Sequence, residues 1–300
     1  VLAAATLAAC GSARPGRALA TGPPRSLERS RSSHVIVVVM ENEENSNVIG
    51  SAAAPYANAL ARRYGLATQS FAIAHPSLPN YLALTGGATH GISSDCTDCH
   101  VAAANIVDEL QAAKVSWRAY MEDQPTPCFR GSGFAGYAKK HNPFIYYDDV
   151  ASNPSRCRRI VGFGQLEDDL RSARLPTFAW ITPNLCDDGH DCGVAAGDRF
   201  LARTVPLLLR ELGPHGLLVL TWDEGSSDAG CCRRAARGGH VTTIVAGPDV
   251  RPGARETRPV DHYGVLATIE RALGLPLLAR SADPANGTLQ ALFQRPPRAR

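Results

Sequence analysis

A serine with the surroundings of a nucleophile occurs in the segment HPSLPNYLALTGG, which runs from His75 to Gly87. Pro76 and Pro79 lie on either side of Ser77, and Asn80 follows three residues after the serine. A serine hydroxyl becomes a good nucleophile at neutral pH when a base or a metal ion lowers its pKa. At this spacing Ser77 and Asn80 share one face of the first turn of a helix, where the helix N-terminus attracts an anion. A serine N-cap with a proline in the first turn is the alternative, and the two interpretations are compatible.

Carboxylates and amides follow two predicted strands at the points where these strands end. Glu41 and Asn42 come directly after the apolar run HVIVVVM, and Asp223 and Glu224 come after GLLVLTW. Side chains at the carboxyl ends of parallel strands meet at one edge of a sheet. Oxygen ligands suit a hard divalent cation, and histidine adds affinity for zinc or iron. The pattern predicts a divalent metal site beside Ser77, with the identity and number of the ions left open.

The elements that must position these residues alternate between strand and helix. Continuous apolar runs at 34–40, 177–183, 216–222 and 240–248 are typical of strands that are buried on both faces of a parallel sheet. Helical patterns cover 54–65, about 103–114, 195–212 and 261–275, and Gly274 closes the last of them. This order predicts an α/β fold with a central, mostly parallel sheet, helices on both of its faces and a single large domain.

The segment from 128 to 164 does not follow this alternation. It contains many glycine, proline and aromatic residues and has no clear period. We interpret it as a cap-like insertion within a catalytic domain that spans residues 34–300.

The first residues, VLAAATLAACGS, form an apolar run that is shorter than the roughly 20 residues a membrane span needs. The run ends in Leu-Ala-Ala-Cys, which resembles the lipobox of bacterial lipoproteins and predicts lipidation of Cys10. A plain signal peptide with an incidental cysteine is the alternative. The following residues, up to 33, are rich in Pro, Gly, Arg and Ser and are predicted to form a flexible tether.

Charge and cysteine content narrow the class of protein further. The 31 basic and 28 acidic residues give a net charge of +3, and no basic patch alternates with aromatic residues, so a nucleic-acid partner is not expected. Apart from Cys10 there are eight cysteines, and an even number in an exported chain favours disulfides. Cys186 and Cys192 flank the loop CDDGHDC and are predicted to form a disulfide that stiffens it. The pairing of the other six cysteines stays open.

Several motifs occur together in a fixed order between about His34 and Leu278. They are VVVMEN, HPSLPNYLALTGG, KHNPF, ITPNLCDDGHDC, TWDEG and HYGVLATIE. As a set they resemble the phosphoesterase family of bacterial secreted acid phosphatases and phospholipases C, which belongs to the alkaline phosphatase superfamily. Because the chain is short, it is most similar to the compact secreted acid phosphatases and phosphoinositide phosphatases.

The resemblance implies roles for the motif residues. It implies four metal ligands, namely Glu41, Asn42, Asp223 and Glu224. It also implies that Ser77 is the nucleophile and that Asn80 contacts a phosphate oxygen. His141 of KHNPF would face the leaving group as general acid, and His262 would add a contact from the last helix. His190 would be a second metal ligand or a phosphate contact, and weaker candidates are Asn184, Asp191 and His240.

The function expected from these residues is that of an exported, metal-dependent phosphomonoesterase that works through a phosphoserine at Ser77. Its substrate would be a phosphorylated small molecule or a lipid headgroup, and it would touch a membrane only through a lipid anchor at Cys10. A phospholipase C or phosphodiesterase with the same core is one alternative, and a surface lipoprotein that binds a phosphorylated or metal ligand without turnover is another. A sulfatase is not expected, because most sulfatases modify a cysteine where this chain has serine.

Overall fold

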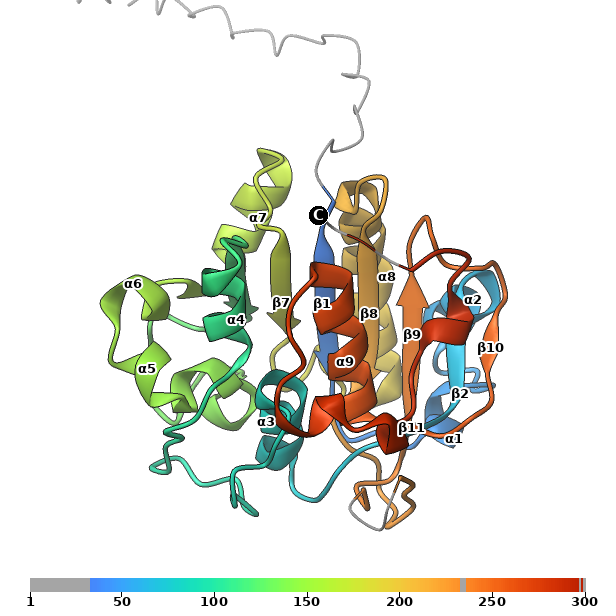
Figure 1. The fold of residues 1–300 in the computed structure, drawn as a ribbon, viewed down its shortest axis with the longest axis horizontal. Helices are drawn as coiled ribbons and strands as arrows, with labels where there is room; N and C mark the ends of the chain where they lie inside the picture. The colour runs from blue at the N-terminus through green and yellow to red at the C-terminus, as the bar shows by residue number, and fades with distance from the viewer. Residues whose placement is uncertain (1–32, 233–235, 297, 299–300) are drawn as a thin grey trace, which may run out of the picture.

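The centre of the molecule is a nine-stranded sheet, seen in a computed structural model that describes residues 33–232, 236–296 and 298 (Figure 1). The strands are β1 (Val35–Met40), β2 (Gly65–Phe71), β3 (Trp117–Met121), β6 (Ile160–Val161), β7 (Phe178–Thr182), β8 (Leu217–Trp222), β9 (His240–Ala246), β10 (Arg255–Glu256) and β11 (Val260–Asp261). They lie in the order β10-β2-β9-β8-β1-β7-β3-β6, and β11 also pairs with β2. Within this sheet β9 is the strand that runs antiparallel to its neighbours, β2 and β8. The predicted mostly parallel sheet is confirmed.

The central strand β1 is buried on both faces. Val35, Val37 and Val39 pack into one hydrophobic core, and the alternate residues of the strand pack into a second core on the other face. Successive side chains of a strand point to opposite faces, so a continuous apolar run is what a doubly covered strand requires.

Helices cover both faces of the sheet and form these two cores with it. One face carries α3 (Ser77–Gly86), α4 (Ile106–Ala112) and α9 (His262–Leu273), with α9 in front of the sheet in Figure 1. The other face carries α2 (Pro55–Arg63), α7 (Phe163–Arg171) and α8 (Val194–Glu211). Gly274 ends α9 with a φ of 66°, as the sequence predicts, because a left-handed C-cap favours glycine. The single α/β domain is thus as expected.

The segment from 128 to 164, which the sequence predicts to be a cap-like insertion, packs into the main core. It forms the hairpin strands β4 (Gly133–Phe134) and β5 (Tyr137–Ala138), the short helices α5 (Asp148–Ala151) and α6 (Pro154–Cys157), and the edge strand β6. Its aromatic residues Phe144, Tyr146 and Tyr147 are buried in the same core as α3. Phe144 and Tyr146 lie in the 3-10 helix Pro143–Tyr146 and Tyr147 follows it, so their spacing does not show the period of an α-helix or a strand.

Four disulfides occur within the described residues. Cys186 pairs with Cys192, as predicted. The pairs that the sequence left open are Cys96–Cys99, Cys128–Cys157 and Cys231–Cys232.

The N-terminal expectations concern residues that the structure does not describe. Cys10 and the signal and tether segment up to residue 32 lie outside the described residues. Among the helices that the structure does describe, none combines the length and the apolar character needed to cross a membrane.

Candidate active site

Three polar segments meet at the carboxyl edge of the sheet, which is the lower edge in Figure 1. Glu41 follows β1 and Asp223 follows the neighbouring β8, while Ser77 is the first residue of α3. The strands β1 and β8 are parallel, and their last residues, Met40 and Trp222, lie opposite each other. Glu41 and Asp223 therefore leave the sheet side by side, and all three polar residues are buried. The structure contains the predicted convergence.

The Ser77 hydroxyl lies between two carboxylates. Its Oγ is 3.1 Å from Oε1 of Glu224 and 3.3 Å from Oε2 of Glu41. The N-cap of α3 is Pro76, and the Ser77 side chain makes no capping hydrogen bond. The simple N-cap interpretation is therefore wrong, and the hydroxyl faces the cluster of acidic groups.

Four carboxylates crowd this edge of the sheet. Glu41, Asp188 and Asp223 are fully buried, and Glu224 is 6% exposed. Burial, reinforced by the neighbouring acidic groups, raises the pKa of Glu41 and of Asp223 well above the usual range. Burial likewise raises the pKa of Asp188 to about 7 and raises that of Glu224. Uncompensated negative charge is costly in a protein interior, and a bound cation would offset it.

Several buried polar atoms around these carboxylates lack hydrogen-bond partners among the described residues. They are Oδ1 of Asn42, Oδ2 of Asp188, Oδ2 of Asp223 and both ring nitrogens of His141. Buried polar atoms in folded proteins are nearly always hydrogen-bonded, so each orphan needs a reason. One ligand atom from each of Glu41, His141 and Asp188 lies within 4.8 Å of the others. This set of oxygen and imidazole donors fits a divalent metal ion.

The geometry does not support His141 as the predicted general acid. Its Nε2 is 3.2 Å from Oε2 of Glu41, its Nδ1 is 3.4 Å from Oδ2 of Asp188, and its ring stacks on Tyr81. Burial, followed by the neighbouring Lys140 and His190, lowers the pKa of His141 well below the usual range. A buried neutral imidazole between two carboxylates is suited to metal ligation and carries no proton for a leaving group.

The Asn80 amide is fully used by the backbone. Its Oδ1 accepts hydrogen bonds from the N–H groups of Ile73 and Ala74, at 2.9 and 3.0 Å. Its Nδ2 donates to the carbonyls of Ala74 and Pro76, at 2.7 and 3.3 Å. An amide offers two acceptor and two donor sites, and all four are taken. Asn80 thus shapes the loop that delivers Ser77, and the geometry does not support the predicted phosphate contact.

His262 contacts the backbone of Asp223. It is the first residue of α9, and its Nε2 donates a hydrogen bond of 2.6 Å to the Asp223 carbonyl. The ring is fully buried, and burial lowers its pKa to about 4. The contact that the resemblance implies is therefore made to the backbone of Asp223.

His190 lies at the rim of the site in the loop closed by Cys186 and Cys192. Its Nδ1 is 2.7 Å from Oδ1 of Asp191, and its Nε2 is 3.3 Å from Nζ of Lys140. Its ring centroid is 5.7 Å from that of His141. Both ring nitrogens therefore have protein partners, Asp191 on one side of the ring and Lys140 on the other.

Two weaker candidates have other roles. The Asn184 side chain accepts hydrogen bonds from the backbone N–H groups of Cys186 and Asp187 and shapes the start of the loop. The His240 ring bonds the Thr68 carbonyl and stacks on Phe71. Neither side chain is brought into contact with the carboxylate cluster.

Sequence reasoning did not assign roles to several residues that the structure places here. Asp188 is one, and its signal was its position in the acidic loop CDDGHDC. The Tyr81 hydroxyl donates to Oε1 of Glu41, and Nδ1 of His75 pairs with Oε2 of Glu224. Tyr81 lies four residues after Ser77, and this spacing puts both on one face of α3.

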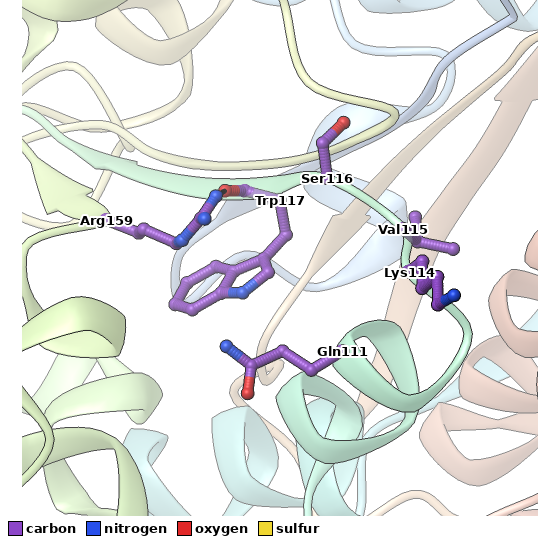
Figure 2. Close-up of a pocket in the computed structure, with 6 residues that line it drawn as sticks. All are labelled: Gln111, Lys114, Val115, Ser116, Trp117 and Arg159. Carbon is purple, nitrogen blue, oxygen red and sulfur yellow. Dashed lines mark hydrogen bonds between the residues drawn. The ribbon is translucent and has the colours of Figure 1, made fainter.

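A separate cavity of about 420 Å³ lies at the amino end of β3 (Figure 2). Trp117, the first residue of β3, lines it beside Arg159 and Gln111. The Ser116 hydroxyl in this cavity is hydrogen-bonded to Thr177. The lining contains no carboxylate or histidine among the described residues, so the catalytic features lie at the other end of the sheet, around Ser77.

Solved structures share the fold at low sequence identity. A protein of the alkaline phosphatase superfamily from Vibrio parahaemolyticus superposes with a TM-score of 0.55 at 12% identity, covering 81% of this chain and 67% of that one. Murine ectonucleotide pyrophosphatase/phosphodiesterase 5, solved with AMP, superposes with a TM-score of 0.57 at 12% identity, covering 87% of this chain and all of that one. The fold is that of the alkaline phosphatase superfamily.

Sequence comparisons identify relatives at higher identity than these structures. A phosphatidylinositol-3-phosphatase of Mycobacterium tuberculosis is 36% identical over 251 residues, covering 81% of this chain and 78% of the relative. An acid phosphatase of Aspergillus fumigatus is 32% identical over 234 residues, but this chain spans only 51% of its length. The profile of the Phosphoesterase family matches residues 51–276. The chain therefore belongs to the Phosphoesterase family.

Proposed function

We propose that the chain hydrolyses phosphate monoesters, with Ser77 as the nucleophile and a divalent metal ion bound beside it. The observation that carries this proposal is the position of the Ser77 hydroxyl between the buried carboxylates of Glu41 and Glu224. The named activities of the relatives, an acid phosphatase and a phosphatidylinositol-3-phosphatase, support a phosphoric ester as substrate.

The residues that would hold the metal are the carboxylates of the cluster and the neighbouring residues whose buried oxygen or nitrogen atoms lack hydrogen-bond partners in the described structure. They are Glu41, Asn42, Asp223 and Glu224, with His141 and Asp188 as further ligands. The fit rests on the orphaned donor atoms and on the raised carboxylate pKa values, both of which a cation would relieve. When bound, a divalent ion would lower the pKa of a serine hydroxyl and neutralise charge on a phosphoryl group.

Ser77 and Glu224 carry out the transfer of the phosphoryl group in this proposal. The Ser77 hydroxyl proton leaves along the hydrogen bond to Glu224, and Oγ attacks phosphorus. The new Oγ–P bond forms as the ester P–O bond breaks, and the departing alcohol keeps the electron pair and takes a proton from solvent. Water then attacks phosphorus as the Oγ–P bond of the phosphoserine breaks. Oγ takes its proton back from Glu224, one proton of the water returns to solvent, and phosphate is released. Tyr81 and His75 hold the two carboxylates in place through their own hydrogen bonds.

The proposal also covers the substrate class, export of the protein and its contact with a membrane. The substrate class is a phosphorylated small molecule or a lipid headgroup, and the name of the mycobacterial relative supports the latter. The disulfides support export, because such bonds persist in oxidising compartments. A lipid anchor at Cys10 would be the contact with a membrane, and no nucleic-acid partner is proposed.

The test compares metal-replete wild type with Ser77→Ala on 4-nitrophenyl phosphate and bis(4-nitrophenyl) phosphate. We expect the variant to lose on the order of 10³-fold or more in kcat while its circular dichroism and thermal midpoint are kept. Ser155→Ala removes an exposed hydroxyl in α6 and is the matched control with unchanged turnover.

The same measurements contain the results that would overturn the proposal. Retained turnover in Ser77→Ala removes this residue from the role of nucleophile. Faster cleavage of the diester by the wild type favours the phosphodiesterase alternative. If the metal-replete protein cleaves no phosphoester while a chelator shifts its thermal midpoint, it is a binding lipoprotein.

A further inference from the structure

Lys140 places a positive charge at the rim of the carboxylate cluster. It belongs to the 3-10 turn Lys139–His141, and its Nζ lies 3.0 Å from Oδ2 of Asp95 and 3.3 Å from Nε2 of His190. The ion pair with Asp95 holds the ammonium beside the site.

Two of the three N–H groups of the Lys140 ammonium have acceptors in the described structure. A carboxylate only accepts, so Nδ1 of His190 donates to Asp191; an ammonium only donates, so Nε2 accepts from Lys140. The Asp95 carboxylate accepts a second hydrogen bond from the ammonium. An ammonium has three donors, and the third has no protein partner in the part of the chain that the structure describes.

Asp95 fixes where this ammonium lies relative to the nucleophile. Its Oδ2 contacts Lys140, and its Oδ1 accepts a 3.0 Å hydrogen bond from the backbone N–H of Leu78. Leu78 follows Ser77 directly in the first turn of α3. One carboxylate thus ties the Lys140 ammonium to the backbone next to the Ser77 hydroxyl.

We propose that Lys140 binds a terminal oxygen of the substrate's phosphoryl group and makes the site selective for phosphate monoesters. Asp95 and His190 are positioning residues that act through Lys140. A monoester has one more terminal oxygen and more negative charge than a diester, so a fixed ammonium stabilises it more. The inference rests on the proposed phosphatase function and deepens it.

The experiment compares Lys140→Met with Lys139→Met. The neighbouring Lys139 donates to the Thr97 carbonyl and lies 4.9 Å over the Tyr146 ring, so it is a matched control away from the cluster. For Lys140→Met we expect kcat/KM to fall about 100-fold on 4-nitrophenyl phosphate and less than tenfold on methyl 4-nitrophenyl phosphate. Inhibition by inorganic phosphate should weaken by about tenfold or more, and Lys140→Arg should recover part of both effects.

A double-mutant cycle tests the positioning role. Asp95→Ala alone should lower the monoester kcat/KM about tenfold, but it should have little further effect on monoester selectivity in the Lys140→Met background. Additive effects would show that Asp95 does not act through Lys140. Circular dichroism and thermal midpoints identify a variant that fails to fold, and Lys140→Gln then takes the place of Lys140→Met.

The outcomes separate this inference from the proposed function. Equal losses on monoester and diester, or no loss, in a folded Lys140→Met variant overturn the role of Lys140. If the wild type has no esterase activity, or if Ser77→Ala retains it, the proposed function itself fails.

Discussion

The Ser77 hydroxyl lies 3.1 Å from Oε1 of Glu224, although 147 residues separate the two in the chain. The serine opens α3, and the glutamate follows the end of β8. The contact exists because α3 begins beside the carboxyl edge of the sheet, and it brings a hydroxyl into a cluster of buried carboxylates. This relationship is the basis of the proposed phosphoserine chemistry.

Neutralising Asp188 is expected to weaken divalent metal binding. The residue is fully buried, its Oδ2 has no hydrogen-bond partner in the described structure, and it lies with Glu41 and His141 in one group of ligand atoms. Asp188→Asn keeps an acceptor for the backbone N–H of His190 but removes the charge. We expect the metal dissociation constant to rise roughly 10- to 100-fold, measured by calorimetric titration and by elemental analysis after dialysis.

The control for this change is Asp187→Asn in the same loop, where the carboxylate contacts Arg203. Metal content should be unchanged in this variant. Equal metal affinity in Asp188→Asn and the wild type would mean that Asp188 is not a ligand.

Glu270→Gln is expected to remove a pH dependence of stability. Glu270 is fully buried in α9, where it accepts from the Leu278 N–H and contacts the Ser281 hydroxyl. Burial raises its pKa from 4.5 to about 7, so between these values the folded state binds more protons than the unfolded state. Its contribution to stability is therefore full below about pH 4.5 and is lost as the pH rises through about 7.

Glutamine resembles the protonated form and keeps both contacts. We expect Glu270→Gln to be close to wild type in free energy of unfolding at pH 4.5 and more stable by roughly 3 kcal/mol at pH 8, measured by denaturant titration. Glu167→Gln, on the exposed surface of α7, is the control. An unchanged difference between variant and wild type across this pH range would contradict the expectation.

Removing the Cys186–Cys192 disulfide is expected to disturb the metal site as well as stability. The six-residue separation predicts a loss of about 2 kcal/mol in the Cys186→Ser/Cys192→Ser variant. The closed loop contains Asp188, so metal affinity should fall too. Denaturant unfolding and metal titration measure the two effects separately.

The disulfide Cys128–Cys157 provides the comparison, because it closes a longer loop of separation 29 and lies away from the carboxylates. Its removal should cost more stability than removal of Cys186–Cys192 but leave the metal affinity unchanged. If both double variants lose metal affinity equally, the Cys186–Cys192 bridge has no particular role at the site.

Some of the site was readable from local sequence. Glu41 and Asp223 follow strands with continuous apolar runs, a pattern typical of parallel strands that are buried on both faces. The carboxyl ends of parallel strands converge, so these residues were expected to meet near Ser77 without any knowledge of their contacts. The core role of the segment 128–164 was not readable, because its buried aromatic residues follow no helix or strand period.

The sequence by itself determined the four central strands, several of the helices that cover them and part of the set of residues at the carboxyl edge, because periodicity and strand ends are local properties. The tertiary structure alone decided what each side chain contacts there. It turned Asn80 toward the backbone, His262 toward the Asp223 carbonyl, and His141 toward Glu41 and Asp188. Hydrogen-bond partners depend on the direction of side chains that are far apart in the chain, and residue type and spacing do not encode that direction.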